Sequence, residues 1–148
     1  MGNYKVYPNK LKGKVKIPPS KSMAHRAVIC AALSNGLSKL TNIDYSDDII
    51  ATIDAMKSLG AIINKKDYYL EVIGIKSPDN KCKDIDSERI IDCNESGSTL
   101  RFLVPIAAIF DGANRFIGRG NLGKRPLDTY YNISVSYTHL RAHETGAY

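Results

Sequence analysis

The stretch that decides the fold is Ser-Lys-Ser-Met-Ala-His-Arg-Ala-Val-Ile-Cys-Ala-Ala-Leu-Ser-Asn-Gly, residues 20–36. Its hydroxyl-bearing start offers N-cap candidates and its Asn-Gly end offers a stop, so it predicts a helix running to about Leu33. Between these signals the residues are apolar on nearly every side. A helix of that kind is buried all round.

A second stretch of the same kind starts at Gly97-Ser98-Thr99 and is apolar to Phe110. It predicts another buried helix, which Pro105 should kink and Asp111-Gly112 should stop. A shift of 76 residues superimposes Ser20, Ser22 and Gly36 on Ser96, Ser98 and Gly112, with Arg26 displaced by one position from Arg101. Because the order of the surrounding elements repeats as well, we expect an internal duplication.

The segments around these helices alternate polar and apolar residues, as half-exposed strands do. A third helix, from about Ile49 to Leu59, follows Ser46-Asp47-Asp48 and stops at Gly60, and Pro126 marks the first turn of a fourth. Since the helices are the most apolar elements, we expect an inside-out α/β fold, with buried helices and outer sheets. The strands are expected at 12–17, 38–43, 61–64, 68–75, 89–93 and 114–117, with a loop at 76–88.

The composition narrows the classes of partner. The chain has 148 residues and a net charge of +6, which suits one domain with anionic partners. No aromatic platform accompanies the lysines and no apolar run could cross a bilayer, so we expect neither nucleic acid nor membrane as a partner. The three cysteines form no CxxC motif and Cys30 lies in an apolar run, which indicates a core position and a reducing, cytoplasmic setting.

Two helix starts could hold anions. Lys21, Ser22 and Arg26 lie at or near the first helix start, where free N–H groups and the dipole attract negative charge. Taken alone, this pattern is more often a plain N-cap with solvated cations. Gly97, Ser98 and Arg101 form a second such start, and the loop 118–125 adds further cations that could converge on it: Arg119, Lys124 and Arg125.

Other polar residues give weaker signals. Asp47-Asp48 is more typical of helix capping and dipole compensation than of a catalytic pair, and His25 is expected on the helix surface. His139 and His143 have ligand spacing, but no third ligand lies between them, so we expect no metal site.

Four motifs in order resemble those of the enolpyruvyl transferases. They are Ser20-Lys21-Ser22-x₃-Arg26, Ser46-Asp47-Asp48 with Leu59-Gly60-Ala61, Glu95-x-Gly97-Ser98-Thr99-x-Arg101, and Gly123-x-Arg125-Pro126-Leu127. The match covers residues 12–133 and is closest to the branch that acts on shikimate 3-phosphate. The sister branch, which uses a UDP-amino sugar, favours Asn at the position of Ser22 and ranks second.

The resemblance implies a domain of βαβαββ repeats, of which residues 1–133 would supply about two. Residues 134–148 continue no family pattern and are expected to be a non-native tail. It also implies a transferase that moves the enolpyruvyl group of phosphoenolpyruvate to the 5-hydroxyl of shikimate 3-phosphate, in aromatic amino-acid biosynthesis and without a cofactor.

The resemblance assigns roles to individual residues. Lys21 would be catalytic and contact both substrates, while Ser22 and Arg26 would hold shikimate 3-phosphate. Phosphoenolpyruvate would be held by Gly97 and Arg125, supported by Ser98 and Arg101. Glu95 stands where the family has asparagine. The complete enzyme would be monomeric, and this length of it is expected to be inactive alone. A non-catalytic module that binds phosphorylated metabolites stays the alternative.

Overall fold

The computed structural model describes residues 3–10, 12–15, 17–76, 88–110 and 112–144. Helices and strands follow in the order α1, β1, α2, β2, β3, β4, α3, β5, a short 3₁₀ helix and α4. Their bounds are α1 Lys21–Leu33, β1 Leu37–Thr41, α2 Asp47–Ser58, β2 Ile62–Lys65, β3 Tyr69–Ile73, β4 Arg89–Asp92, α3 Gly97–Ala107, β5 Asn114–Ile117, η1 Leu122–Lys124 and α4 Asp128–Glu144.

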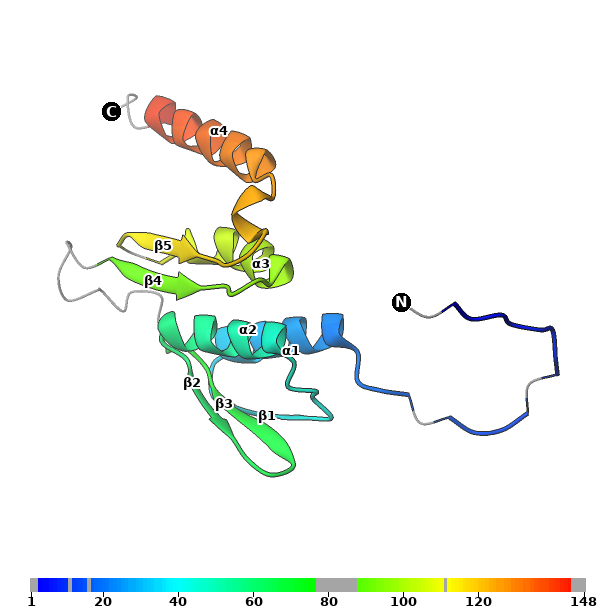
Figure 1. The fold of residues 1–148 in the computed structure, drawn as a ribbon. Helices are drawn as coiled ribbons and strands as arrows, with labels where there is room; N and C mark the ends of the chain where they lie inside the picture. Colours follow the sequence, from blue (N-terminus) through cyan, green and yellow to red (C-terminus); the bar gives the residue numbers. More distant parts are fainter. Residues whose placement is uncertain (1–2, 11, 16, 77–87, 111, 145–148) are drawn as a thin grey trace.

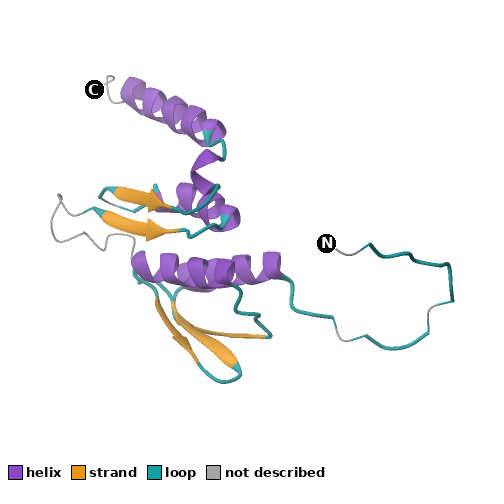
Figure 2. Cartoon of the chain, viewed as in Figure 1, coloured by secondary structure: helices purple, strands orange, loops and turns teal. Residues whose placement is uncertain are grey.

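Two of the helices, α1 and α2, lie between two separate sheets (Figures 1 and 2). One sheet has the order β1-β3-β2 and is antiparallel, with Thr41 opposite Tyr69 and Lys65 opposite Leu70. The other is the parallel pair β4-β5, whose strands are joined through α3. The helices α1 and α2 pack on each other between these sheets, so the expected α/β layering with inner helices and outer sheets is found. The described residues close no barrel.

The repeat predicted from the sequence holds for these elements. A shift of 76 residues carries α1 onto α3 and β1 onto β5, within two residues at each end. The two copies of the repeat pack against one another, the first containing α1 and α2 and the second containing α3. The core between these two units contains residues from both, including Val28, Ile49, Met56, Ile91 and Leu103, which are all 0% exposed. The two units therefore share one core and do not form two separate ones.

The helix ends agree with the stop signals. Gly60 has a φ of +107° and follows α2, where its N–H donates to the carbonyl of Lys57 while that of Ala61 donates to Met56. This is a Schellman ending, which favours glycine because of its positive φ. In contrast, α3 ends at Ala107, three residues before the predicted end at Phe110. Beyond Pro105, the N–H groups of Ile109 and Phe110 reach back only three residues, so the helix tightens and stops.

Three sequence expectations about burial and pairing are wrong. The described residues of segment 12–17 form no strand, and Val15 and Ile17 are exposed. An alternating pattern becomes a strand only with a partner, and the segment lies away from the rest of the molecule (Figure 1). Cys30 is exposed rather than in the core. The helices α1 and α3 are not buried all round, since Met23 on α1 is more than half exposed and Pro105 on α3 is exposed.

The C-terminal part is a single helix, α4, which runs across the expected boundary at residue 133. Tyr131 and Ile133 on it are exposed. The helix begins at Asp128, so Pro126 precedes its first turn and does not lie within it. Most of the expected loop at 76–88 lies outside the described residues. Within the described part, no helix is both long and apolar enough to cross a membrane.

Candidate functional site

Serines cap the starts of α1 and α3. The hydroxyl of Ser20 accepts from the N–H of Met23 at 3.4 Å, and that of Ser96 accepts from the N–H of Thr99 at 3.2 Å. Each bond satisfies one of the N–H groups that a helix start leaves free. The remaining N–H groups and the helix dipoles make both starts favourable places for an anion.

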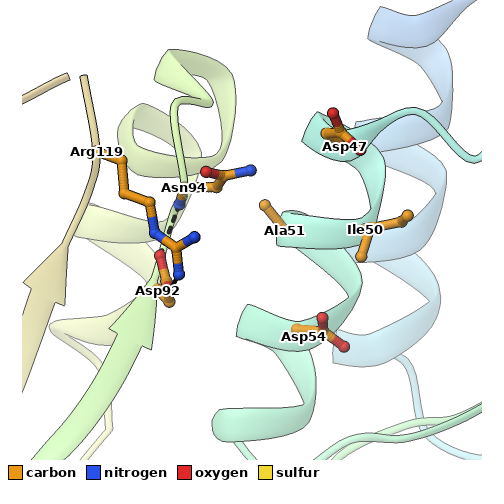
Figure 3. Close-up of a pocket in the computed structure, with 7 residues that line it drawn as sticks. All are labelled: Asp47, Ile50, Ala51, Asp54, Asp92, Asn94 and Arg119. Atoms are coloured by element: carbon orange, nitrogen blue, oxygen red, sulfur yellow. Dashed lines mark hydrogen bonds and ion pairs between the residues drawn. The ribbon is translucent and has the colours of Figure 1, made fainter. Parts of the chain in front are cut away.

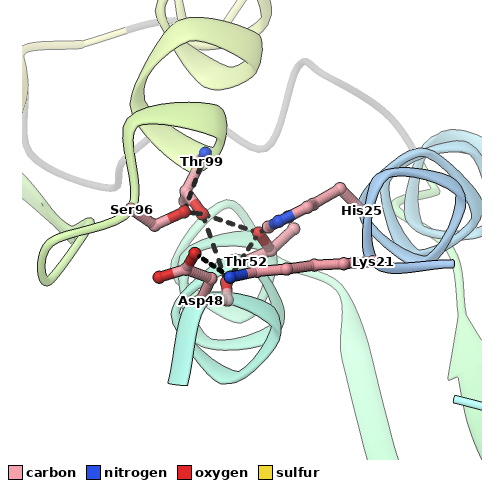
Figure 4. A network of polar contacts seen from close by, with 6 residues as sticks. All are labelled: Lys21, His25, Asp48, Thr52, Ser96 and Thr99. Carbon is pink, nitrogen blue, oxygen red and sulfur yellow. Dashed lines mark hydrogen bonds and ion pairs between the residues drawn. The ribbon is translucent and has the colours of Figure 1, made fainter. Parts of the chain in front are cut away.

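The starts of α1, α2 and α3 are joined by side chains in the interior (Figure 4). The hydroxyl of Thr52 on α2 lies 2.7 Å from Nδ1 of His25 on α1 and 2.7 Å from the hydroxyl of Thr99 on α3. The two helix starts that the sequence singled out therefore lie at the same end of the molecule.

Lys21 forms an ion pair with Asp48, which lies in the first turn of α2 (Figure 4). The Lys21 side chain is 55% exposed, so its ammonium remains within reach of a ligand. Helix capping and dipole compensation therefore do not fully account for the Asp47-Asp48 pair, because Asp48 also binds Lys21. Asp48 places the cation of α1 beside the start of α2, whereas Ser46, the N-cap of α2, makes no side-chain capping bond.

His25 is buried, with 1% of its surface exposed, so the prediction that it lies on the helix surface is wrong. Burial is the main reason that its pKa lies below 6.5. Asp48 opposes that lowering and Lys21 adds to it. The signal that could have found it is helical spacing, because residue 25 shares a face with Val28 and Ala32, which are fully buried.

Arg26 lies on the exposed surface of α1 and faces α3. Its guanidinium carbon lies 5.5 Å from the centre of the Phe102 ring, and one of its nitrogens donates to the carbonyl of Ser22 at 3.4 Å. The side chains of Ser22, Ser98 and Arg101 are also exposed near these helix starts. The hydroxyls and fork-shaped cations that the sequence predicted for an anion site are thus accessible to a ligand.

The guanidinium of Arg125 lies directly against the backbone of Gly97, where any Cβ would collide with it. The 3₁₀ helix holds this arginine in place, because Leu122 is 3% exposed and anchors the loop in the core. Gly97 thus allows a cation to approach the first turn of α3 closely. The expected convergence of the loop on this helix start is confirmed for Arg125.

Arg119 from the same loop points elsewhere. It pairs with Asp92 at 3.2 Å and lines a hollow beside α2 together with Asp47 and Asp54 (Figure 3). Three carboxylates around one guanidinium make this hollow unfavourable for an anionic ligand. The described residues contain no group of three side chains that could hold a metal ion.

Comparison with known proteins identifies the family. The family model of EPSP synthase (3-phosphoshikimate 1-carboxyvinyltransferase) matches residues 6–132. A 3-phosphoshikimate 1-carboxyvinyltransferase of Clostridium beijerinckii is 77% identical over 134 residues, which are 90% of this chain and 31% of the relative. One of Clostridium botulinum is 75% identical over 134 residues, which are 90% of this chain and 30% of that relative.

The fold has a counterpart among solved structures. An EPSP synthase of Acinetobacter baumannii superimposes with a TM-score of 0.59 at 22% identity, over 78% of this chain and 26% of that one. The fold and the motifs are therefore those of the enolpyruvyl transferases. Within that class, the chain belongs to the EPSP synthase family, which confirms the ranking of its two branches. The chain spans about 30% of the length of the curated relatives it matches.

Proposed function

We propose that this chain forms part of a 3-phosphoshikimate 1-carboxyvinyltransferase and binds shikimate 3-phosphate and phosphoenolpyruvate at the starts of α1 and α3. The proposal rests chiefly on the guanidinium of Arg125, which lies against the backbone of Gly97 at a capped helix start. A fixed cation beside free N–H groups suits a phosphate or a carboxylate. The chemistry of both ligands fits, because each carries phosphate and carboxylate groups.

The two helix starts would share the ligands between them. Ser22 and Arg26 would hold shikimate 3-phosphate on α1. Gly97 and Arg125 would hold phosphoenolpyruvate on α3, supported by Ser98 and Arg101. Side chains in the core connect α1 with α2 and α2 with α3 close to these starts.

Lys21 would contact both ligands and act in catalysis. In the transfer, the oxygen of the 5-hydroxyl adds to C2 of phosphoenolpyruvate, its proton passes to a base, and C3 takes up a proton from an acid. The bond from C2 to the phosphate oxygen then breaks, and C3 releases a proton as the double bond reforms. An ammonium near C2 would stabilise the negative charge on the departing phosphate. No step needs a cofactor, and we expect a monomeric cytoplasmic enzyme without nucleic-acid or membrane partners.

A titration followed by amide NMR tests the binding site. Shikimate 3-phosphate should shift the amide signals of Lys21 and Ser22, and phosphoenolpyruvate those of Gly97 and Ser98. We expect dissociation constants in the millimolar range or weaker, roughly −4 kcal/mol. Shikimate without its phosphate is the ligand control and should cause no such shifts. Lys21→Ala should abolish both responses, and shifts that persist in this variant would contradict the proposal.

A phosphate-release assay on the same chain separates binding from turnover. Proton transfer to C3 and exclusion of water are both needed for acceleration, and the residues named here supply neither. We therefore expect binding without sustained release of phosphate, as in a binding module for phosphorylated metabolites. Sustained release that depends on Lys21 would show that these helix starts are sufficient for catalysis.

A further inference from the structure

A chain of buried hydroxyl groups connects the starts of α1 and α3 through α2 (Figure 4). It runs from His25 through Thr52 and Thr99 to the hydroxyl of Ser96, with 2.7 Å at each step. All four residues are at most 1% exposed. The backbone carbonyl of Asp48 accepts from Thr52 at 3.2 Å and from Thr99 at 3.3 Å. The same residue that pairs with Lys21 therefore also anchors the chain of hydroxyls.

The number of protons on these groups determines which of them donates at each hydrogen bond of the network. Each threonine hydroxyl has one proton, and the Asp48 carbonyl can only accept. If Nδ1 of His25 donates to Thr52, each threonine keeps its own proton. Thr52 and Thr99 can then donate to the Asp48 carbonyl or to the next hydroxyl of the network. If Nδ1 accepts instead, Thr52 gives up its proton and the Nε2–H of His25 is left as a buried donor. Nε2 has no partner in the structure, so we assign the proton of neutral His25 to Nδ1.

Polar contacts of this kind fix a geometry that apolar packing leaves adjustable. Helices that meet only through aliphatic side chains can slide or rotate with little loss of contact. A buried hydroxyl loses a full hydrogen bond when it moves by a fraction of an ångström, because no water replaces its partner. The network thus determines how α1 and α3 stand relative to each other at the ligand-binding end.

We propose that His25, Thr52 and Thr99 are positioning residues that hold the anion-binding start of α1 at a fixed separation from that of α3. The inference rests on the proposed function, since it assigns the network a role in binding two ligands side by side. None of the three residues would touch a ligand. They act through the residues that do, which are Lys21, Ser22 and Gly97.

This role predicts a characteristic pattern of effects. A residue that contacts one ligand weakens that ligand alone, whereas a change in the spacing of the two starts weakens both. Lys21 begins α1 and its ammonium pairs with Asp48 in the first turn of α2, so its contacts with the two ligands depend on the same spacing. Displacements of about 1 Å are enough to lower the reaction of bound ligands strongly. Substitutions in the network should therefore weaken shikimate 3-phosphate and phosphoenolpyruvate together, with little effect on the fold.

Isosteric substitutions test this pattern. Thr52→Val and Thr99→Val each remove a hydroxyl at nearly constant volume, and the matching serine variants restore it. Ser58→Ala is the control, because it removes a hydroxyl on the exposed side of α2 that bonds only to its own helix. For each variant, NMR titrations give the affinity for both ligands and thermal melting gives the folded fraction. We expect both affinities to fall about tenfold or more in the valine variants and to recover in the serine variants.

The outcomes separate the two proposals. If the folded valine variants bind both ligands as the parent does, or if their loss only follows the unfolded fraction, the positioning role is overturned. If the parent binds neither ligand, the proposed function fails and the positioning role falls with it. The ¹⁵N signals of the His25 ring give a check without ligand. A neutral ring protonated on Nδ1 supports the network as assigned, and protonation on Nε2 overturns it.

Discussion

The guanidinium of Arg26 on α1 lies 5.5 Å from the centre of the Phe102 ring on α3. The ring orients the side chain without neutralising it, and no described acidic side chain forms an ion pair with Arg26. At an exposed position such a contact contributes only about 0.5–1 kcal/mol to stability. The arginine is thus held in place while its fork stays available for an anion.

Arg26→Ala should therefore affect binding much more than folding. In a complete enzyme that contains this chain, we expect the affinity for shikimate 3-phosphate to fall by about 2–4 kcal/mol, provided that the fork is desolvated against the phosphate. The free energy of unfolding should change by less than about 1 kcal/mol. Arg115→Ala removes an exposed arginine that pairs with Glu88 and serves as the control. An unchanged affinity in the Arg26 variant would contradict the assignment of this residue to the substrate.

The features that the sequence predicts well are those with local causes. The serine at position 20 caps the next turn, Gly60 ends the preceding helix, and β5 is found where alternation placed it, at Asn114–Ile117. Each depends on residues within a few positions along the chain. The positions of Lys21, Gly97 and Arg125 near helix starts follow from the same local signals together with the family motifs.

The features that the sequence misses depend on distant partners. The segment 12–17 alternates as a strand does, yet no described strand lies beside it. His25 and Thr52 are 27 residues apart in sequence, and Thr52 and Thr99 are 47 apart. Only the packing of three helices brings these side chains together. A histidine on an apolar helix face was the one local indication that a buried polar partner existed.

Gly97→Ala should displace Arg125 and disturb the phosphoenolpyruvate side of the site. The added Cβ would overlap the guanidinium, which can swing away because it is the end of a flexible side chain. The helix itself should not suffer, since alanine is favoured over glycine by roughly 0.5–1 kcal/mol. We expect loss of the amide shifts caused by phosphoenolpyruvate at an unchanged or higher melting temperature.

The control for this substitution is Gly123→Ala. Gly123 lies in the same loop as Arg125, and a Cβ there meets no atom within 4 Å. Its phosphoenolpyruvate response should match that of the parent chain. Equal responses in the Gly97 and Gly123 variants would mean that the contact between Gly97 and Arg125 does not contribute to ligand binding.

Removal of residues 134–148 should leave the rest of the molecule unchanged. The deletion removes α4 from residue 134 onward, but Tyr131 and Ile133 just before the cut are 71% and 51% exposed, so little apolar surface is uncovered. We expect the melting temperature and the amide signals of α1–α3 to stay as they are. A melting temperature that falls by several degrees, or amide signals of the core that shift, would show that these residues belong to the fold and are not a tail.

Acidification should destabilise the protein through His25. Its pKa lies below 6.5 in the folded state, chiefly because of burial and despite the attraction of Asp48. Below pH 6.5 the unfolded chain therefore binds a proton at this position that the folded chain does not bind. The free energy of unfolding should then fall as the pH drops from 7.5 to 5.5, with a slope of at most about 1.4 kcal/mol per pH unit from this group. Urea unfolding at several pH values measures the slope. His25→Gln, which cannot titrate, should flatten the profile over this range, and a slope that is the same in both proteins would show that His25 is not its source.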